Sequence, residues 1–364
     1  MARRIVQISA GRDRSIALGS DGQAWGWGSV KVLGAVLPPG YPGDLCISNP
    51  TEIGHNRYAQ PVPQRLNPEG MPFALVADGH ADTVAVRREG TVLSCRPVVS
   101  PEHGIQRAPV AGLPGSPTQV VHTESAALAM YADGTVWSWG MRAQGQLGRD
   151  SEHLFAEPKR IEALPAVASL TAGQGHVMAL DRKGNVWTWG ANAAGQLGQG
   201  DLIQRSVPRK LDLPVRIRRI AAGDTHSLAV DDAARLWAWG SNHHGQAGAF
   251  EARHLSRPTR VGTRFPVAQI DGGMFYTVAT SVHGDVFAWG WNGLGQLGAE
   301  APSASARPVR LKSLSRVTQL SAGTSHVLAL SDQGVHAWGN NRCSACGDFP
   351  SVEVLPRPSL VALA

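Results

Sequence analysis

The chain has 364 residues, 43% of them hydrophobic, and a formal net charge of +6 at pH 7, which is enough apolar material for a sizeable core. No apolar stretch approaches the about 18 residues of a membrane helix, and residues 1–5 lead into repeat sequence without a signal peptide, so we expect a cytoplasmic protein and no membrane partner; a non-standard secretion route stays open. The positive charge is mostly arginine, which we interpret as a solvated surface rather than a nucleic-acid groove.

Seven similar units follow one another along the chain. Each has a short apolar strand that ends at an equivalent position, and these positions are 68, 44, 50, 50, 50 and 50 residues apart: Gly11, Gly79, Thr123, Gly173, Gly223, Gly273 and Gly323. A fixed period of this length is typical of repeat folds, in which each unit buries its apolar face against its neighbours. We expect one domain with units 1–66, 67–115, 116–162, 163–212, 213–262, 263–312 and 313–364.

Each unit continues with an alternating strand, a tight turn and a strand that carries tryptophan. Trp187-Thr188-Trp189-Gly190 is an example, and related phrases recur at intervals of about fifty residues. Residues two apart on a strand point to the same side, so both rings share one face. We interpret these tryptophans as structural and each unit as a small antiparallel sheet.

A second phrase, Gly-Gln-Leu-Gly, follows the tryptophan strand. The stretch from Trp189 to Gly198 reads Trp-Gly-Ala-Asn-Ala-Ala-Gly-Gln-Leu-Gly, and the pattern Trp-Gly-x-Asn-x-x-Gly-Gln-Leu-Gly recurs from Trp289 to Gly298. This composite resembles the RCC1-like repeat family, named for the regulator of chromosome condensation, over essentially the full length of the chain. The resemblance implies an all-β, seven-bladed β-propeller with four-stranded antiparallel blades.

The period fails first in unit one, where an insertion at about residues 29–60 makes the interval eighteen residues longer than fifty. A long irregular connection is a better candidate for function than a scaffold strand, because its groups reach beyond the rigid body. Five side chains there are our candidate partner contacts: Tyr41, Asp44, His55, Arg57 and Tyr58.

Unit two is eroded. Leu93-Ser94-Cys95 stands where other units have Trp-x-Trp, and the Gly-Gln-Leu-Gly phrase is missing before Pro109, so we expect a notch beside the unit-one insertion.

A further irregular position is the one that holds histidine in units four, five and seven. His176, His226 and His326 are interpreted as structural groups that bond nearby backbone. The first two units have Arg14 and Asp82 there, which either pair across neighbouring blades or face a partner.

Motifs for catalysis, for metal binding and for cofactors are missing. Cys343 and Cys346 have zinc-knuckle spacing without a second pair, and the four cysteines, few and unevenly spaced, favour a reducing compartment. The sequence has no nucleophile elbow, phosphate-binding loop or His-Glu-x-x-His motif. We expect no enzyme, no catalytic residue, no metal and no cofactor.

The leading hypothesis is therefore a monomeric module that binds a partner protein through propeller loops. The resemblance supports it, since some relatives regulate or inhibit other proteins, and it also implies an alternative, guanine-nucleotide exchange on a small GTPase. Chromatin or nucleic-acid association is a third hypothesis, for which the only candidate residues are the basic ones between units four and five: Arg205, Arg209, Lys210, Arg216, Arg218 and Arg219.

Overall fold

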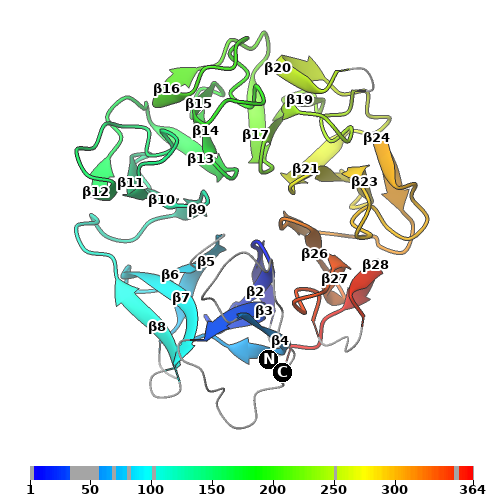
Figure 1. The fold of residues 1–364 in the computed structure, drawn as a ribbon, viewed down its shortest axis with the longest axis horizontal. Coiled ribbons are helices and arrows are strands. Elements are labelled where there is room, and N and C mark those ends of the chain that lie inside the picture. The colour runs from blue at the N-terminus through cyan, green and yellow to red at the C-terminus, as the bar shows by residue number, and fades with distance from the viewer. Residues whose placement is uncertain are drawn as a thin grey trace.

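Seven small blades surround a central channel in the computed structural model (Figure 1). It describes residues 4–32, 57–67, 71–79, 83–100, 104–249, 252–347 and 352–363. Every regular element within these ranges is a β-strand, and the 28 strands form seven antiparallel blades of four. The predicted seven-bladed propeller is confirmed. None of the described segments forms a helix of the length and apolarity that crossing a membrane requires.

The strands run in chain order through the seven blades. Blades 1 to 3 contain β1 (Ile5–Ala10), β2 (Arg14–Gly19), β3 (Ala24–Val32), β4 (Arg57–Arg65), β5 (Phe73–Asp78), β6 (Thr83–Arg87), β7 (Val92–Ser100), β8 (Gly104–Pro109), β9 (Gln119–His122), β10 (Ala126–Met130), β11 (Val136–Met141) and β12 (Phe155–Arg160). Blades 4 and 5 contain β13 (Val167–Ala172), β14 (His176–Asp181), β15 (Val186–Gly190), β16 (Arg205–Lys210), β17 (Ile217–Ala222), β18 (His226–Asp231), β19 (Leu236–Ser241) and β20 (His254–Arg260). Blades 6 and 7 contain β21 (Val267–Gly272), β22 (Tyr276–Ser281), β23 (Val286–Trp291), β24 (Ala304–Leu311), β25 (Gln319–Ala322), β26 (His326–Ser331), β27 (Gly334–Asn340) and β28 (Val354–Leu360).

The core lies between neighbouring blades. Leu128 and Val136 of blade 3, for example, pack with Val177 and Trp189 of blade 4. The second tryptophan of the phrase is at most 1% exposed in five blades, at Trp27, Trp189, Trp239, Trp289 and Trp338. Each burial removes about 150–250 Å² of apolar surface from water, so these rings stabilise the stacking of the blades as the sequence predicts.

Each of these five indoles also bonds the blade before it. The Nε1–H donates to the main-chain carbonyl at the Gln position of the preceding turn, with distances of 3.0 Å from Trp189 to Gln146, 2.8 Å from Trp239 to Gln196, 3.0 Å from Trp289 to Gln246, 2.9 Å from Trp338 to Gln296 and 3.0 Å from Trp27 to Ala345. Burial and hydrogen bond together fix each blade against its neighbour.

The ring closes without exchange of strands. The N-terminal strand β1 is the innermost strand of blade 1, and the C-terminal strand β28 is the outermost strand of blade 7. The two ends lie close together (Figure 1). Because Trp27 donates to Ala345 across this junction as other blades do across theirs, blades 7 and 1 meet like any neighbouring pair.

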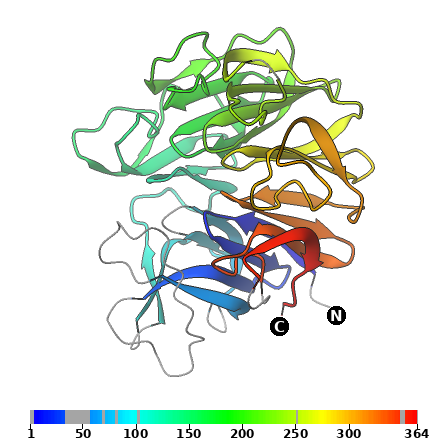
Figure 2. The same ribbon diagram turned by 45° about the vertical axis from the view of Figure 1, so that its right-hand side comes forward.

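Blades 1 and 2 depart from this regularity. The strands β3, β4 and β7 each have nine residues, compared with five in β15. At their far ends β3 and β7 pair in parallel, Lys31 with Val98 and Val32 with Val99, so the two blades form one eight-stranded sheet. In Figure 2 this extended pair lies in the lower part of the ring. The sheet therefore includes both ends of the segment predicted as an irregular loop at 29–60, and residues 33–56 lie outside the described residues.

Candidate functional site

The histidine position links each blade to the next. Each histidine places its Nε2 atom 2.9 Å from a hydroxyl oxygen of the next blade. The pairs are His176 with Ser227 Oγ, His226 with Thr277 Oγ1 and His326 with Ser15 Oγ. Burial lowers their pKa values to about 4, about 3 and about 4, so all three rings are neutral at physiological pH. The structural interpretation is confirmed, although the partner is a hydroxyl of the next blade rather than nearby backbone. Among the described residues no group of His, Cys, Asp and Glu side chains could hold a metal.

Blade 1 has an ion pair at this position. Arg14 Nε lies 2.8 Å from Asp78 Oδ1 of blade 2, and the Arg14 Nη2 group contacts the same oxygen. Thr83 Oγ1 donates to Asp78 Oδ1 at 2.7 Å. The side chains of Arg14 and Asp78 are 10% and 0% exposed. Arg14 therefore pairs across neighbouring blades, with Asp78 as its partner, while Asp82 lies outside the described residues.

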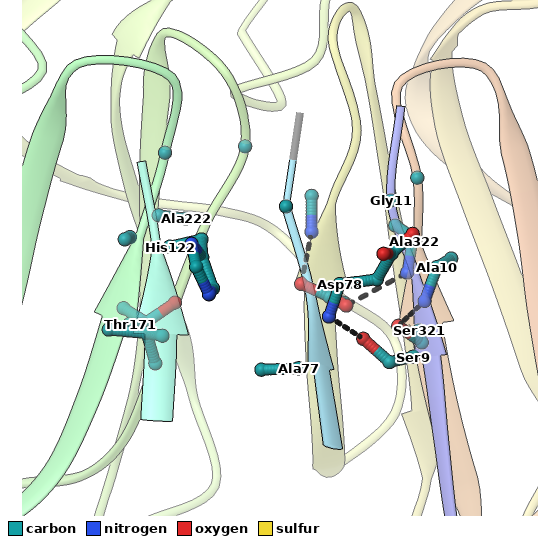
Figure 3. A pocket seen from close by; sticks show the side chains of 18 of the residues that line it. Ser9, Ala10, Gly11, Ala77, Asp78, His122, Thr171, Ala222, Ser321 and Ala322 are labelled. Atoms are coloured by element: carbon teal, nitrogen blue, oxygen red, sulfur yellow. Dashed lines mark hydrogen bonds between the residues drawn. The ribbon is translucent and has the colours of Figure 1, made fainter. Parts of the chain in front are cut away.

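The central channel contains a cavity of about 210 Å³ lined by the inner strands. Polar side chains there bond the main chain of the next blade: Ser321 Oγ accepts from Ala10 N at 2.9 Å and Ser9 Oγ accepts from Asp78 N at 3.0 Å (Figure 3). Drug-sized ligands occupy pockets of about 300–1,000 Å³. The cavity is smaller than that, and Ser9 and Ser321 are engaged in holding the blades together.

One acid in the channel, Asp271, stands in a position that is serine in blades 1 and 7. Asp271 accepts hydrogen bonds from Gly272 N at 2.9 Å and Ala322 N at 2.8 Å, as Ser9 and Ser321 accept from their next blades. Burial raises the pKa of Asp271 to about 7. The carboxyl is therefore partly protonated near neutral pH.

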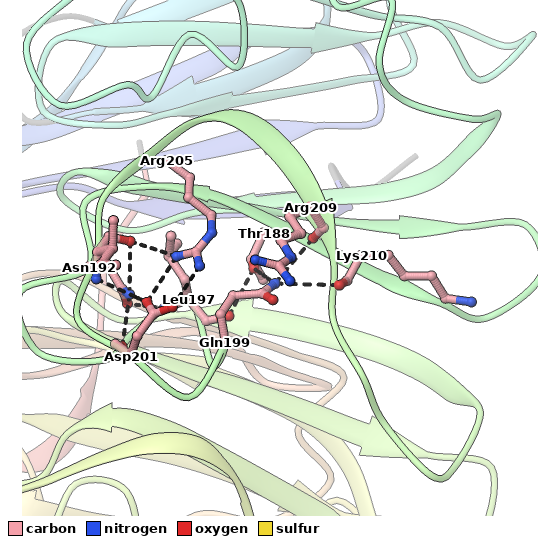
Figure 4. Close-up of polar contacts among 9 residues, drawn as sticks. Thr188, Asn192, Leu197, Gln199, Asp201, Arg205, Arg209 and Lys210 are labelled. Atoms are coloured by element: carbon pink, nitrogen blue, oxygen red, sulfur yellow. Dashed lines mark hydrogen bonds and ion pairs between the residues drawn. The ribbon is translucent and has the colours of Figure 1, made fainter.

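The Gly-Gln-Leu-Gly phrase forms a compact turn on the blade that carries it. In blade 4, Asn192 Oδ1 accepts from Leu197 N at 2.9 Å, and Arg205 Nη2 lies 2.7 Å from Asp201 Oδ2 (Figure 4). The hydrogen bond from Arg205 lowers the pKa of Asp201 to about 2. Arg205, one of the basic residues considered for nucleic-acid binding, is therefore engaged within its own blade.

Blade 7 builds the same turn with cysteine in the leucine position. Cys346 N donates to Asn341 Oδ1 at 2.9 Å, and its buried thiol is free, with a pKa raised by burial. Cys343 is disulfide-bonded, which differs from the expectation of reduced cysteines. Sequence spacing does not show which distant cysteines a fold brings together.

Blade 2 lacks this turn. Only residues 101–103 separate β7 from β8, whereas 14 residues, 191–204, separate β15 from β16. The tryptophan that would pack beneath such a turn is Trp139 of blade 3. Its ring is partly exposed, and it forms no hydrogen bond with any described residue through its indole nitrogen.

Exposed apolar residues lie next to Trp139 on blade 3. Leu154 is 60% exposed and Phe155 is 65% exposed. Phe155 pairs with Met141, two residues beyond Trp139, and Leu154 O accepts from Arg142 N at 2.8 Å. We call Trp139, Met141, Leu154 and Phe155 the Trp139 surface.

Only two of the five contact residues predicted in the insertion lie within the described residues. Tyr41, Asp44 and His55 lie outside the described residues, and Arg57 and Tyr58 begin β4, where they pair with Lys31 and Val30 on the extended β3. The structure thus places Arg57 and Tyr58 at the base of the insertion.

Sequence reasoning missed the Trp139 surface. The sequence feature that indicates it is the missing Gly-Gln-Leu-Gly phrase of unit two. Without that phrase, blade 2 has no turn to pack on the tryptophan of the next blade.

Comparisons with known proteins agree with this fold. A family model described as the RCC1-like domain matches residues 48–363, and one described as the regulator of chromosome condensation (RCC1) repeat matches residues 5–29. No curated protein matches the sequence.

Three solved structures are similar to the chain. Human WBSCR16 has a TM-score of 0.76 and 23% identity, with 92% of this chain and 94% of that chain covered. Prp20p from Saccharomyces cerevisiae, described with its binding properties to Gsp1p and histones, has a TM-score of 0.73 and 21% identity, with 90% and 83% covered. Yeast RCC1 (Prp20) bound to Kap60 has a TM-score of 0.71 and 21% identity, with 90% and 81% covered. At these identities the likeness shows the fold alone.

Proposed function

The chain belongs to the RCC1-like domain family, and from that premise we propose that it binds a partner protein through the loops of blades 1 to 3. The observation that carries the proposal is the contrast between the regular blades 4 to 7 and the joined blades 1 and 2. Blades 4 to 7 repeat the same tryptophan hydrogen bond to the preceding turn, whereas blades 1 and 2 share an eight-stranded sheet beside exposed apolar residues. Irregularity concentrated in one part of a rigid ring is typical of a recognition surface.

The ring supplies rigidity for this role. Its blades are held against one another by buried tryptophans, histidines and the Arg14–Asp78 pair. Pre-organised surfaces lose less entropy on binding. We propose Tyr41, Asp44, His55, Arg57, Tyr58 and Asp82 as contacts, and we leave Arg14 out because its guanidinium is buried against Asp78.

Deletion of residues 33–56, with a short Gly-Ser linker between Val32 and Arg57, tests the proposal. We expect circular dichroism and melting to remain unchanged, because β3 and β4 stay paired, and capture of the partner from the native source to be lost. The matched control replaces Leu202 and Ile203, an exposed apolar pair on blade 4, by serine. Capture that survives the deletion, or that is lost equally in the control, would contradict the proposal.

Guanine-nucleotide exchange on a small GTPase is the second candidate, favoured by the likeness to Prp20p, which is described with its binding properties to Gsp1p. Such an activity would require no catalytic side chain of the propeller, because a binding protein that stabilises the empty GTPase releases its nucleotide. Release of a labelled guanine nucleotide from the small GTPases of the native source is the assay. Acceleration by the wild-type chain would support exchange, and release at the spontaneous rate with all of them would exclude it in favour of binding alone.

A further inference from the structure

Trp139 differs from its five counterparts in one respect. Trp27, Trp189, Trp239, Trp289 and Trp338 each donate their Nε1–H to the carbonyl of a turn on the preceding blade, at 2.8–3.0 Å. Trp139 is partly exposed, and its Nε1–H has no such acceptor among the described residues. An indole N–H that is not fully covered gains most from a partner that supplies a carbonyl.

The repeats themselves show which chemistry fits this position. In blade 4 the turn above the next tryptophan presents the Gln196 carbonyl to Trp239, and the 0%-exposed Leu197 packs inside the turn beside it. The turn is held by Asn192, which accepts from Leu197 N at 2.9 Å. A complementary ligand for Trp139 is therefore a main-chain turn that offers a carbonyl and one apolar side chain.

The rim of this position carries two large apolar side chains in blade 3. Phe155 occupies the position of Gln204, His254, Ala304 and Val354 in blades 4 to 7, and Leu154 occupies that of Ile203, Arg253, Ser303 and Glu353, as their strand pairing shows. Ile203 is also exposed, but it lies on a blade whose Trp189 has its turn, whereas Leu154 and Phe155, 60% and 65% exposed, lie on the blade whose tryptophan lacks it. Solvated apolar residues of this size favour burial against another chain.

We propose that the Trp139 surface binds a β-turn of a partner protein that replaces the missing blade-2 turn. The partner's main-chain carbonyl accepts from Trp139 Nε1–H, and a leucine-like side chain packs against Met141 and Phe155. This inference rests on the proposed function and specifies the element of the partner that is recognised.

A cyclised peptide with the sequence of residues 192–198, Asn-Ala-Ala-Gly-Gln-Leu-Gly, is the probe. It is titrated into the whole protein while the indole N–H signals are followed by NMR, with the Trp139 signal assigned from W139F. We expect a saturable shift of the Trp139 signal and no comparable shift of its five counterparts, Trp27, Trp189, Trp239, Trp289 and Trp338. The same peptide with its leucine replaced by aspartate is expected to have no effect.

Three variants complete the test, each checked for an unchanged melting temperature. Loss of one hydrogen bond in W139F is expected to weaken peptide binding by about fivefold, as followed by fluorescence anisotropy of a labelled peptide. The double variant L154S/F155S is expected to weaken it by at least about tenfold, because two apolar contacts are lost. L202S/I203S on blade 4 is expected to bind as the wild type does.

An unmoved Trp139 signal at millimolar peptide would overturn the inference, as would an equal shift with the aspartate peptide. The partner assay separates this inference from the proposed function. If capture is lost on deletion of residues 33–56 but is complete with W139F and L154S/F155S, the inference is wrong and the proposed function is still supported. Full capture by the deletion variant, by W139F and by L154S/F155S would contradict both the inference and the proposed function.

Discussion

At the scale of the residue, the tryptophan at one repeat position is buried or partly exposed according to whether the preceding blade has a turn that packs on it. Trp189 and Trp139 stand at equivalent positions of consecutive blades, Trp189 opposite Val177 on its neighbouring strand and Trp139 opposite Ala127. Trp189 is fully buried and bonded to Gln146 O, whereas Trp139 is partly exposed because blade 2 contributes no turn. The difference arises outside the residue, in the length of a connection one blade away.

Replacement of each by phenylalanine separates these roles. W189F removes the donor from a buried carbonyl and leaves a small void, so we expect the free energy of unfolding to fall by about 1–3 kcal/mol. W139F is expected to cost less than about 1 kcal/mol, because no hydrogen bond is lost. Urea unfolding followed by circular dichroism measures both, and equal losses would show that Trp139 is as structural as Trp189.

The buried histidines make the protein sensitive to acid. Burial lowers the pKa values of His176, His226 and His326 to about 4, 3 and 4, below the ordinary 6.5, so the unfolded chain binds more protons than the folded one below pH 6.5. Each histidine therefore lowers stability as the pH falls from 6.5 towards 4, by about 1.4 kcal/mol per pH unit at most. Melting temperatures between pH 7 and pH 4.5 should fall steeply, and a flat profile would contradict neutral, buried rings.

Asp271 acts in the opposite direction. Its pKa is raised from 3.8 to about 7, so the folded chain keeps a proton that the unfolded chain has lost, and stability falls as the pH rises through this window. Asp271→Ser copies Ser9 and Ser321 and keeps an acceptor for Ala322 N. We expect this variant to melt higher than the wild type at pH 7.5 and to lose most of that advantage by pH 4.5. An advantage that does not change with pH would show that the carboxyl titrates normally.

At the scale of the element, each blade meets the next through glycine. A Cβ at Gly223 would overlap both the His226 ring and the Gly273 carbonyl oxygen of the next blade. Thr123 replaces this glycine in blade 3, where Ala126 stands in the histidine position and leaves room for a side chain. The threonine Oγ1 then accepts from Ala126 N at 3.0 Å, at the start of β10.

These two positions should respond differently to alanine. Gly223→Ala forces the blades apart, and we expect a loss of about 1–3 kcal/mol or more in the free energy of unfolding. Thr123→Ala removes one hydrogen bond and should cost about 0.5–1.5 kcal/mol. Thermal unfolding of the two variants side by side decides the point, and a harmless Gly223→Ala would contradict the close approach of blades 5 and 6.

Much of the blade structure was predictable because it depends on local repeats. The fifty-residue period, the tight turns and the composite around Asn192 each specify one blade, and the lost phrase in unit two indicated where the ring would be incomplete. The partner of Arg14 was not predictable, since Asp78 stands 64 residues away and outside the position that holds Asp82. The parallel contact of Lys31 with Val98 also depends on how two blades sit side by side, which no local pattern encodes.

At the scale of the whole molecule, the ring combines a uniform scaffold with one irregular sector. Blades 4 to 7 repeat the tryptophan bond to the preceding turn, and the junction of blades 7 and 1 repeats it too, through Trp27. Blades 1 and 2 extend into one sheet, and blade 3 exposes the Trp139 surface beside them. A partner that binds this sector would meet a surface that the rest of the ring holds in place.

Hydrogen exchange followed by mass spectrometry, on the protein alone and in complex with its captured partner, shows which sector of the ring the partner covers. We expect slower exchange in the complex for backbone amides of residues 57–67, 92–100 and 136–157, with blades 4 to 6 unchanged. Protection confined to blades 4 to 6, with no change in blades 1 to 3, would contradict it.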